Sequence, residues 1–312
     1  MRAVARVSRP PRRSRSRSRL AAALVALACG AALATCGGDQ GRPREAVLLG
    51  AGDIGDCETQ GDEATARLLD AHPTATIAVL GDVAYRHGSA SDFERCFAPS
   101  WGRFRARMRP ATGNHDHATP DAAGYAAYFG ARGGPAGTYR YSYDLGAWHV
   151  VVLDSDCWRV GGCALDDPQA RWMRADLRRH RARCILAYWH RPPFSSGRYG
   201  DAADTERVRP LWRVAVEEGV DVVLTAHEHS YERHAPMDAK GQPDAAGTRL
   251  FVVGTGGGNL RRYRDPPLPS TEVRNDDTWG VLRLELHPDR YDWRFLPVDA
   301  RTFSDHGSGT CN

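Results

Sequence analysis

Seven side chains of the kinds that bind metal ions follow short apolar stretches of this 312-residue chain. They are the oxygen donors Asp53, Asp82, Tyr85 and Asn114 and the imidazoles His190, His227 and His229. A mixture of hard oxygen and imidazole nitrogen suits zinc, iron, manganese or a similar first-row metal. One Asp or His after a strand is usually a turn or capping residue, but seven such explanations would have to hold together. We therefore predict a single metal site.

Asp82 is the donor that best fits a shared ligand. A carboxylate placed between two strands can bridge two cations about 3.5–4 Å apart, the separation found in two-metal hydrolases. His227 and His229 are two residues apart, so both side chains point to one side of an extended segment. A metal pair of this kind yields a bound hydroxide near neutral pH, which predicts hydrolytic chemistry.

The apolar stretches before these donors are typical of strands buried on both faces. They cover residues 47–49, 76–80, 109–112, 184–189 and 222–226. Between them, residues 62–71, 168–179 and 205–218 carry apolar side chains at helical spacing. Strands that alternate with helices indicate an α/β fold, in which ligands bind at the carboxyl ends of the strands. We expect one domain over residues 46–312, after a short linker at 36–45.

Residues 1–35 are predicted to be a signal peptide. Residues 1–19 hold eight arginines and no acid, and residues 20–35 are uncharged and rich in alanine and leucine. This stretch is shorter than the ~20 apolar residues of a spanning helix. Cleavage after Ala34 is one outcome, and the other is a lipoprotein signal with Cys36 as the lipidated first residue. Either way the protein is expected to be exported, secreted or periplasmic, or held at the cell surface by a lipid.

Without that leader the chain is acidic. The whole chain has a formal net charge of +4, but residues 1–35 contribute eight of the 42 basic residues and none of the 38 acidic ones. The remainder has 34 basic and 38 acidic residues, a net charge of −4. No basic stripe remains that would predict nucleic acid as a partner.

Six cysteines lie beyond Cys36, and an even number in an oxidising compartment predicts disulfides, although fifteen connectivities are open. We expect the pairs Cys157–Cys163, Cys57–Cys96 and Cys184–Cys311. The first closes a short loop with two glycines, the second joins two positions soon after donor-bearing strand ends, and the third is what remains. The alternative is a structural zinc site, which no C-x-x-C spacing supports.

Five blocks of the sequence resemble the motifs of the calcineurin-like metallophosphoesterases, and more narrowly those of the purple acid phosphatase branch. The blocks are Gly52-Asp53-x-Gly55, Gly81-Asp82-x-x-Tyr85, Gly113-Asn114-His115-Asp116, His190 and His227-x-His229. The wider superfamily usually has a histidine in place of Gly55 and a second aspartate in place of Tyr85. The tyrosine marks the purple branch, since phenolate is a strong ligand for ferric iron.

The resemblance covers nearly the whole chain from residue 46. It implies a bacterial, exported member of the family with a single catalytic domain, built as a four-layer α/β/β/α sandwich of two mixed β-sheets. It also implies a dinuclear metal centre of Fe(III) with a divalent zinc, iron or manganese ion. The implied ligands are Asp53, Tyr85 and His229 for the first ion, Asn114, His190 and His227 for the second, and Asp82 as the bridge.

The same resemblance implies how the substrate is handled. His115 would contact the phosphate, together with Asn114, and would help to protonate the leaving alkoxide, while Asp116 would orient His115. The implied reaction is hydrolysis of a small phosphate monoester by a metal-bound hydroxide. Plant and animal members carry a further histidine in the loop after the motif histidine, which is absent from residues 191–204. We expect its place to be taken by Arg191 or by one of Ser195, Ser196, Arg198 and Tyr199.

Two other functions are open on the same motifs. A phosphodiesterase or nucleotidase would use the same scaffold, because the choice of leaving group depends on loops. A non-catalytic surface-binding protein is the third reading, but a decayed site would be expected to have lost at least one ligand. The sequence makes no prediction of the oligomeric state.

Overall fold

The structure is a computed structural model that describes residues 45–312 except 181, 201, 264–265 and 300. The described residues belong to one compact unit. The predicted signal peptide, with Cys36 and nearly all of the linker, lies outside the described residues. Export of the protein and lipidation of Cys36 therefore stay predictions.

A six-stranded mixed sheet carries the first three donor-bearing strands. Across the sheet the order is β13 (His306–Thr310), β12 (Arg290–Pro297), β11 (Gly280–Leu286), β1 (Ala46–Ala51), β2 (Thr76–Leu80) and β3 (Met108–Ala111). β1, β2 and β3 are parallel, whereas β11, β12 and β13 run antiparallel to their neighbours. The parallel strands are largely buried, as their apolar sequences predict. Their shared direction brings Asp53, Asp82 and Asn114 to one edge.

A seven-stranded mixed sheet carries the histidines. Its order is β10 (Thr271–Asn275), β8 (Tyr231–His234), β9 (Arg249–Val253), β7 (Val222–Thr225), β6 (Cys184–Tyr188), β5 (Trp148–Val152) and β4 (Tyr141–Leu145). β5, β6, β7 and β9 are parallel, and β4, β8 and β10 are antiparallel to their neighbours. His190 follows β6 and His227 follows β7, so these donors also lie at carboxyl ends of parallel strands.

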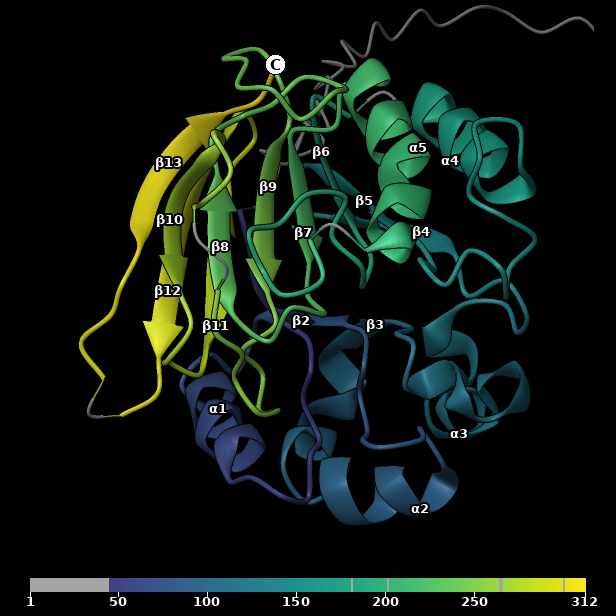
Figure 1. The fold of residues 1–312 in the computed structure, drawn as a ribbon, viewed down its shortest axis with the longest axis vertical. Coiled ribbons are helices and arrows are strands. Elements are labelled where there is room, and N and C mark those ends of the chain that lie inside the picture. Colours follow the sequence, from purple (N-terminus) through teal and green to yellow (C-terminus); the bar gives the residue numbers. More distant parts are fainter. Residues whose placement is uncertain (1–44, 181, 201, 264–265, 300) are drawn as a thin grey trace, which may run out of the picture. The chain divides into compact units, whose positions relative to one another are not determined.

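Helices flank the two sheets, which share one core (Figure 1). The helices are α1 (Gly61–Asp70), α2 (Ala90–Asp92), α3 (Ala123–Phe129), α4 (Pro168–Arg179) and α5 (Ala203–Glu217), with short helical segments of other types at Phe93–Phe97, Trp101–Arg107, Asp116–Ala118, Pro120–Ala122 and Gly130–Gly133. Leu48 of β1 and Leu224 of β7 belong to the core between the sheets. Met173 of α4 and Trp212 of α5 pack in a second core with the other face of β6 and β7. The predicted α/β fold with two mixed sheets and flanking helices is confirmed.

All three expected disulfides are present: Cys57–Cys96, Cys157–Cys163 and Cys184–Cys311. Cys184 begins β6 in the seven-stranded sheet, and Cys311 follows β13 in the six-stranded sheet. The third bridge therefore fastens the two sheets together, far from the strand ends that carry the donors.

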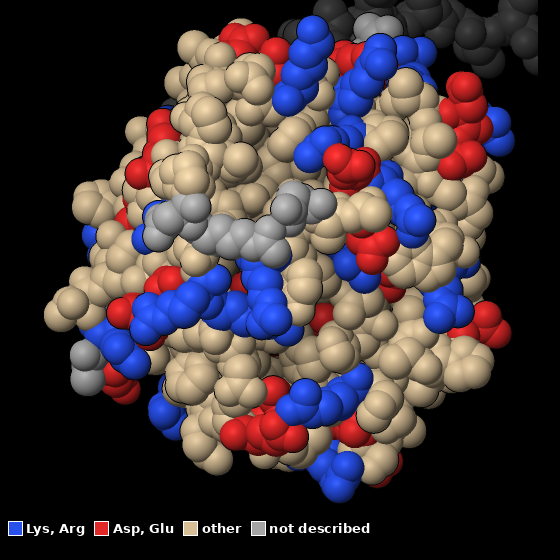
Figure 2. Space-filling model, viewed as in Figure 1, with Lys and Arg blue, Asp and Glu red and all other residues tan. Residues whose placement is uncertain are grey.

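The surface carries both signs of charge. Figure 2 shows Lys and Arg interspersed with Asp and Glu on one face of the molecule. Among the described residues, no helix has both the length and the apolar character needed to cross a membrane.

Candidate metal centre

Asp53, Tyr85 and His229 form one half of a buried donor cluster. The Tyr85 hydroxyl donates to Oδ1 of Asp53 at 2.8 Å and lies 3.0 Å from Nε2 of His229. The same Asp53 oxygen is 3.3 Å from that nitrogen. Asp53 follows β1 in one sheet, whereas His229 follows β7 in the other. This half of the cluster is therefore assembled only where the two sheets meet.

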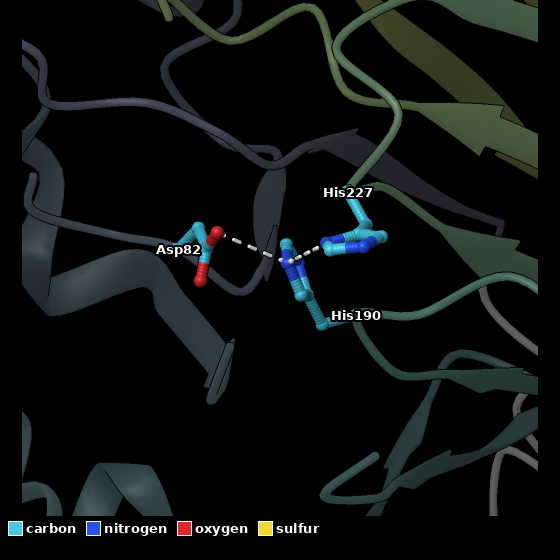
Figure 3. Close-up of side chains that lie close together, drawn as sticks. All are labelled: Asp82, His190 and His227. Carbon is cyan, nitrogen blue, oxygen red and sulfur yellow. Dashed lines mark hydrogen bonds and ion pairs between the residues drawn. The ribbon is translucent and has the colours of Figure 1, made fainter. Parts of the chain in front are cut away.

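Asp82, His190 and His227 form the other half (Figure 3). Oδ2 of Asp82 lies 3.2 Å from Nε2 of His190, which is 3.2 Å from Nδ1 of His227. The Tyr85 hydroxyl is also 3.3 Å from Oδ2 of Asp82, so this one oxygen touches both halves. Asn114 lines a pocket together with Asp82 and His227, and its Oδ1 is buried without a hydrogen-bond partner in the described part of the chain. A buried, unpaired acceptor of this kind is suited to a cation.

Four of the donors have a left-handed backbone. The φ angles are +57° at Asp53, +47° at Asp82, +71° at His227 and +51° at His229. Residues other than glycine seldom adopt this conformation, which costs about 1–3 kcal/mol each. Close packing holds it in place: a Cβ at Gly113 would lie 2.2 Å from Oδ1 of Asp82. Strain of this sort concentrates at functional sites.

Each histidine of the cluster is oriented through its second nitrogen. Nδ1 of His190 lies 2.8 Å from the Leu80 carbonyl oxygen, and Nδ1 of His229 lies 2.7 Å from that of Asn259. A carbonyl only accepts, so we assign a proton to Nδ1 of each ring, and Nε2 is the nitrogen that faces the cluster. His227 is reversed, with Nδ1 toward the cluster and Nε2 3.1 Å from Nη1 of Arg191. Such outer contacts are typical of metal-binding histidines.

The donor cluster is electrostatically suited to cations. Burial and the carboxylates of Asp53 and Asp82 raise the pKa of the Tyr85 hydroxyl well above its ordinary value. Burial alone would raise the pKa of Asp82, but His190 lowers it well below its usual range. Burial alone would lower the pKa of His190, whereas Asp82 raises it to about 9. The carboxylates thus lie in ion-pair or hydrogen-bond contact with the imidazole and phenol groups, and the mixed oxygen and nitrogen donors fit a first-row metal.

His115 lies at the rim of the cluster, with 31% of its side chain exposed. Its backbone N–H donates to Oδ1 of Asp82 at 2.8 Å. Nδ1 of the ring lies 2.6 Å from the carbonyl oxygen of Arg86, and Nε2 is 3.9 Å from Oδ2 of Asp82. The carbonyl of Arg86 thus fixes the ring, which is the role that we expected of Asp116.

Asp116 holds the backbone instead. Its buried carboxylate accepts the N–H of Gly113 at 2.9 Å and that of Val83 at 3.2 Å. These two bonds join the loop that carries Asn114 to the loop that carries Asp82. No contact between Asp116 and the ring of His115 occurs among the described hydrogen bonds, so a catalytic role for Asp116 stays a prediction.

A pocket of 220 Å³ opens beside the cluster and His115. Arg191 and Tyr199, two of the substitutes expected for the missing histidine, line it together with Asp204. Arg261 also lines it and was not predicted. Nη1 of Arg261 donates to the backbone oxygen of His227 at 3.1 Å. The glycine-rich residues 254–258, which precede Arg261, are the one sequence feature that could have indicated a functional loop here.

The other expected substitutes, Ser195, Ser196 and Arg198, are not among the residues that line the pocket, and the loop that carries them is held by two glutamates. The hydroxyls of Ser195 and Ser196 donate to Glu232 at 2.8 and 2.6 Å. The backbone N–H of Tyr199 donates to Glu228 at 2.9 Å. Both glutamates are fully buried. They fix the loop after His190, and nothing in the sequence indicated that they would.

The calcineurin-like phosphoesterase family matches residues 47–231, more than half of the chain, and this segment contains all seven donors. The chain belongs to the calcineurin-like phosphoesterase family. The family predicted from the five motif blocks is thereby confirmed. Members of its purple acid phosphatase branch have a dinuclear metal centre.

Curated relatives point to the same branch. Purple acid phosphatase 18 of Arabidopsis thaliana is 28% identical over 154 residues, and purple acid phosphatase 21 of that plant is 30% identical over 155 residues. Each match covers 47% of this chain and 33% of the relative. The matched part of this chain therefore spans about a third of the length of these relatives. The solved purple acid phosphatase PPD1 from yellow lupin seeds has a TM-score of 0.71 at 16% identity, over 86% of this chain and 54% of that one. That similarity establishes the shared fold.

Proposed function

We propose that this chain is a hydrolase of small phosphate monoesters that works with two metal ions. The observation that supports the proposal is the convergence of seven side chains of metal-binding types from five strand ends. Oδ2 of Asp82 lies 3.2 Å from His190 in one half of this cluster and 3.3 Å from Tyr85 in the other. A shared carboxylate oxygen between two donor sets is the arrangement that a two-metal hydrolase needs.

The ligands divide according to the two halves. Asp53, Tyr85 and His229 are assigned to Fe(III), because phenolate favours a ferric ion. Asn114, His190 and His227 are assigned to a divalent zinc, iron or manganese ion. Asp82 is assigned to both. When bound, such a pair activates water as a nucleophile and neutralises charge on the phosphate.

His115 is proposed to give a proton to the leaving oxygen. The bond to the Arg86 carbonyl fixes one proton on Nδ1, since a carbonyl only accepts. A proton on Nε2, which faces the pocket, is then the one available for transfer. General-acid assistance of this kind contributes about 10²–10⁴ in rate.

Arg191 is proposed to bind the phosphate. It is 7% exposed, its guanidinium lies 3.5 Å from both Asp156 and Asp204, and its Nε has no partner among the described residues. Nη1 of Arg191 donates to Nε2 of His227. If His227 bound a metal through Nδ1, the proton of its neutral ring would be on Nε2, and Nη1 of Arg191 would then be free to donate to a phosphate oxygen. A planar guanidinium matches the oxygens of a phosphate. Asn114, at the edge of the pocket, is the second proposed phosphate contact.

Export is part of the proposal, in secreted, periplasmic or lipid-anchored form. The three disulfides support it, since such bonds persist in oxidising compartments.

The experiment compares metal content and activity in the parent and in Asp82→Ala. The parent is expected to bind two metals per chain and to hydrolyse p-nitrophenyl phosphate faster than its bis ester. Asp82→Ala should lower occupancy at both positions, because it removes a ligand from each. Retention of two metals with near-normal turnover in the variant would refute the dinuclear assignment, and faster hydrolysis of the bis ester would favour a phosphodiesterase.

A further inference from the structure

Trp158 is the single exposed large apolar side chain in the described part of the chain, with 48% of its surface accessible. It lies in the loop that the Cys157–Cys163 disulfide closes. Two guanidinium groups lie over its ring, that of Arg191 at 5.5 Å from the centroid and that of Arg207 at 5.4 Å. One exposed tryptophan is ordinary in itself. Its neighbours, however, connect it to the donor cluster.

Trp158 is connected to the metal centre through Arg191. The same guanidinium that lies over Trp158 contacts Nε2 of His227 at 3.1 Å. Asp204 lines the pocket and pairs with both arginines, at 3.5 Å to Arg191 and 3.2 Å to Arg207. The ring therefore stands one side chain away from the donors, at the side of the pocket formed by Arg191 and Asp204.

A larger cavity is lined by Trp158 and by Arg207, the second arginine that pairs with Asp204. It has a volume of 460 Å³, and its other lining residues include the disulfide-bonded Cys157 and Cys163, Pro210 and the acidic Asp167. An apolar lining with a few polar groups is typical of small-molecule sites of this size. The pocket beside the metal donors measures only 220 Å³. A bulky leaving group must therefore extend beyond that pocket when the phosphate is bound in it.

We infer that Trp158 and its adjoining cavity bind the leaving group, and that the substrates are phosphate monoesters whose leaving group carries a flat aromatic ring. The inference rests on the proposed phosphatase function and adds a substrate class to it. The phosphate binds between His115 and Arg191, and the ring lies against the indole and the disulfide. Aromatic contact of this kind prefers flat rings to branched alkyl chains.

The test compares 2-naphthyl phosphate with ethyl phosphate in the metal-loaded full-length protein. Trp158→Ala should raise KM for the naphthyl ester by about 3- to 10-fold, the range that an aromatic pair supplies. KM for ethyl phosphate and both kcat values should stay within about 2-fold, since Trp158 touches no reacting atom. Trp158→Phe, which keeps a smaller ring, should fall between parent and Ala.

A matched control is Trp172→Ala, the same substitution in α4. Trp172 is partly buried, lies under Arg140 at 5.8 Å and does not line the cavity. It should leave the ratio of the two KM values unchanged. Thermal unfolding of all variants separates loss of binding from loss of folding.

Calorimetric binding of naphthylmethylphosphonate and of methylphosphonate measures the site without any chemistry. The naphthyl compound should bind more tightly to the parent, and Trp158→Ala should abolish the difference. An equal loss for both compounds would mean that Trp158 only positions Arg191, and no loss for either would mean that the cavity is not used. Each result would overturn the inference. A parent that hydrolyses neither ester would instead overturn the proposed function, while the phosphonates still test the cavity.

Discussion

At the level of a single residue, Tyr85 is the donor that we expect to decide the metal chemistry. Its hydroxyl lies within 3.3 Å of Asp53, Asp82 and His229. If it binds Fe(III) as phenolate, the oxidised protein is expected to be pink to purple through charge transfer from ligand to metal. Tyr85→Phe removes the oxygen and keeps the ring, so the colour should disappear while the fold survives. The check is the visible spectrum of both proteins with iron measured on the same samples.

Two results would count against this assignment. A colourless parent that contains iron would exclude coordination by Tyr85. A parent that contains only zinc or manganese would leave the fold and the hydrolytic chemistry in place, but would mean that the motif does not fix the metal.

His115 is expected to affect rate and not metal content. Its ring contacts the Arg86 carbonyl, and its Nε2 is 3.9 Å from Asp82. In His115→Ala both metals should remain, and kcat should fall by about 10²–10⁴. The fall should be smaller for aryl phosphates, because a good leaving group needs little protonation. Equal losses for aryl and alkyl phosphates would exclude the role as general acid.

At the level of elements, the junction of β5 with α4 depends on a buried charged pair. His149 of β5 lies 2.8 Å from Asp176 of α4 and 2.8 Å from Asp144 of β4. The ring of His180 stacks on it at 4.1 Å, and Arg179 is 3.9 Å from Asp176. Burial alone would lower the pKa of His149, but the two carboxylates raise it. Burial alone would raise the pKa of Asp176, but His149 lowers it.

The two shifts define a pH range for the contribution of this pair to stability. The imidazolium of His149 stabilises the fold fully below about pH 6.5 and less as pH rises through its raised pKa. The carboxylate of Asp176 stabilises it above about pH 4 and less as pH falls through its lowered pKa. His149→Gln should therefore cost about 1–3 kcal/mol near pH 5 and clearly less at pH 9. Urea unfolding at both pH values measures this, and a cost independent of pH would mean that His149 is neutral.

At the level of the whole molecule, the Cys184–Cys311 disulfide joins the two sheets across a sequence separation of 127 residues. Replacing both cysteines by serine should lower the free energy of unfolding by about 2–5 kcal/mol, because a long loop of the unfolded chain is released. Metal content should not change, since Cys184 begins β6 and His190 follows its other end. Denaturant unfolding and metal analysis make the comparison.

The matched control is the Cys157–Cys163 bridge, whose sequence separation is only 6 residues. Its double serine variant should lose less stability than the long bridge does. Equal losses would contradict the dependence on loop length and would point to local packing as the source of both effects.

Much of the site followed from the sequence because its signals are local. The donor types, the apolar stretch before each and the placement of Asp53, Asp82 and His190 at strand ends depend on neighbours in the chain. Parallel strands then bring their carboxyl ends together whatever the details of packing. For the same reason the helix that begins at Pro168 and the closure of the Cys157–Cys163 loop could be predicted.

The tertiary structure decided what depends on residues far apart in the chain. It oriented His115 through the carbonyl of Arg86 and left Asp116 to bind backbone N–H groups. It also turned His227 so that Nδ1 faces the cluster, and it placed Trp158 against Arg191. Each of these outcomes depends on which distant polar group lies within hydrogen-bonding or contact distance, and periodicity and spacing carry no information about that. A sequence pattern names the donors of such a site, whereas side-chain packing between the two sheets determines which atom of each residue is used.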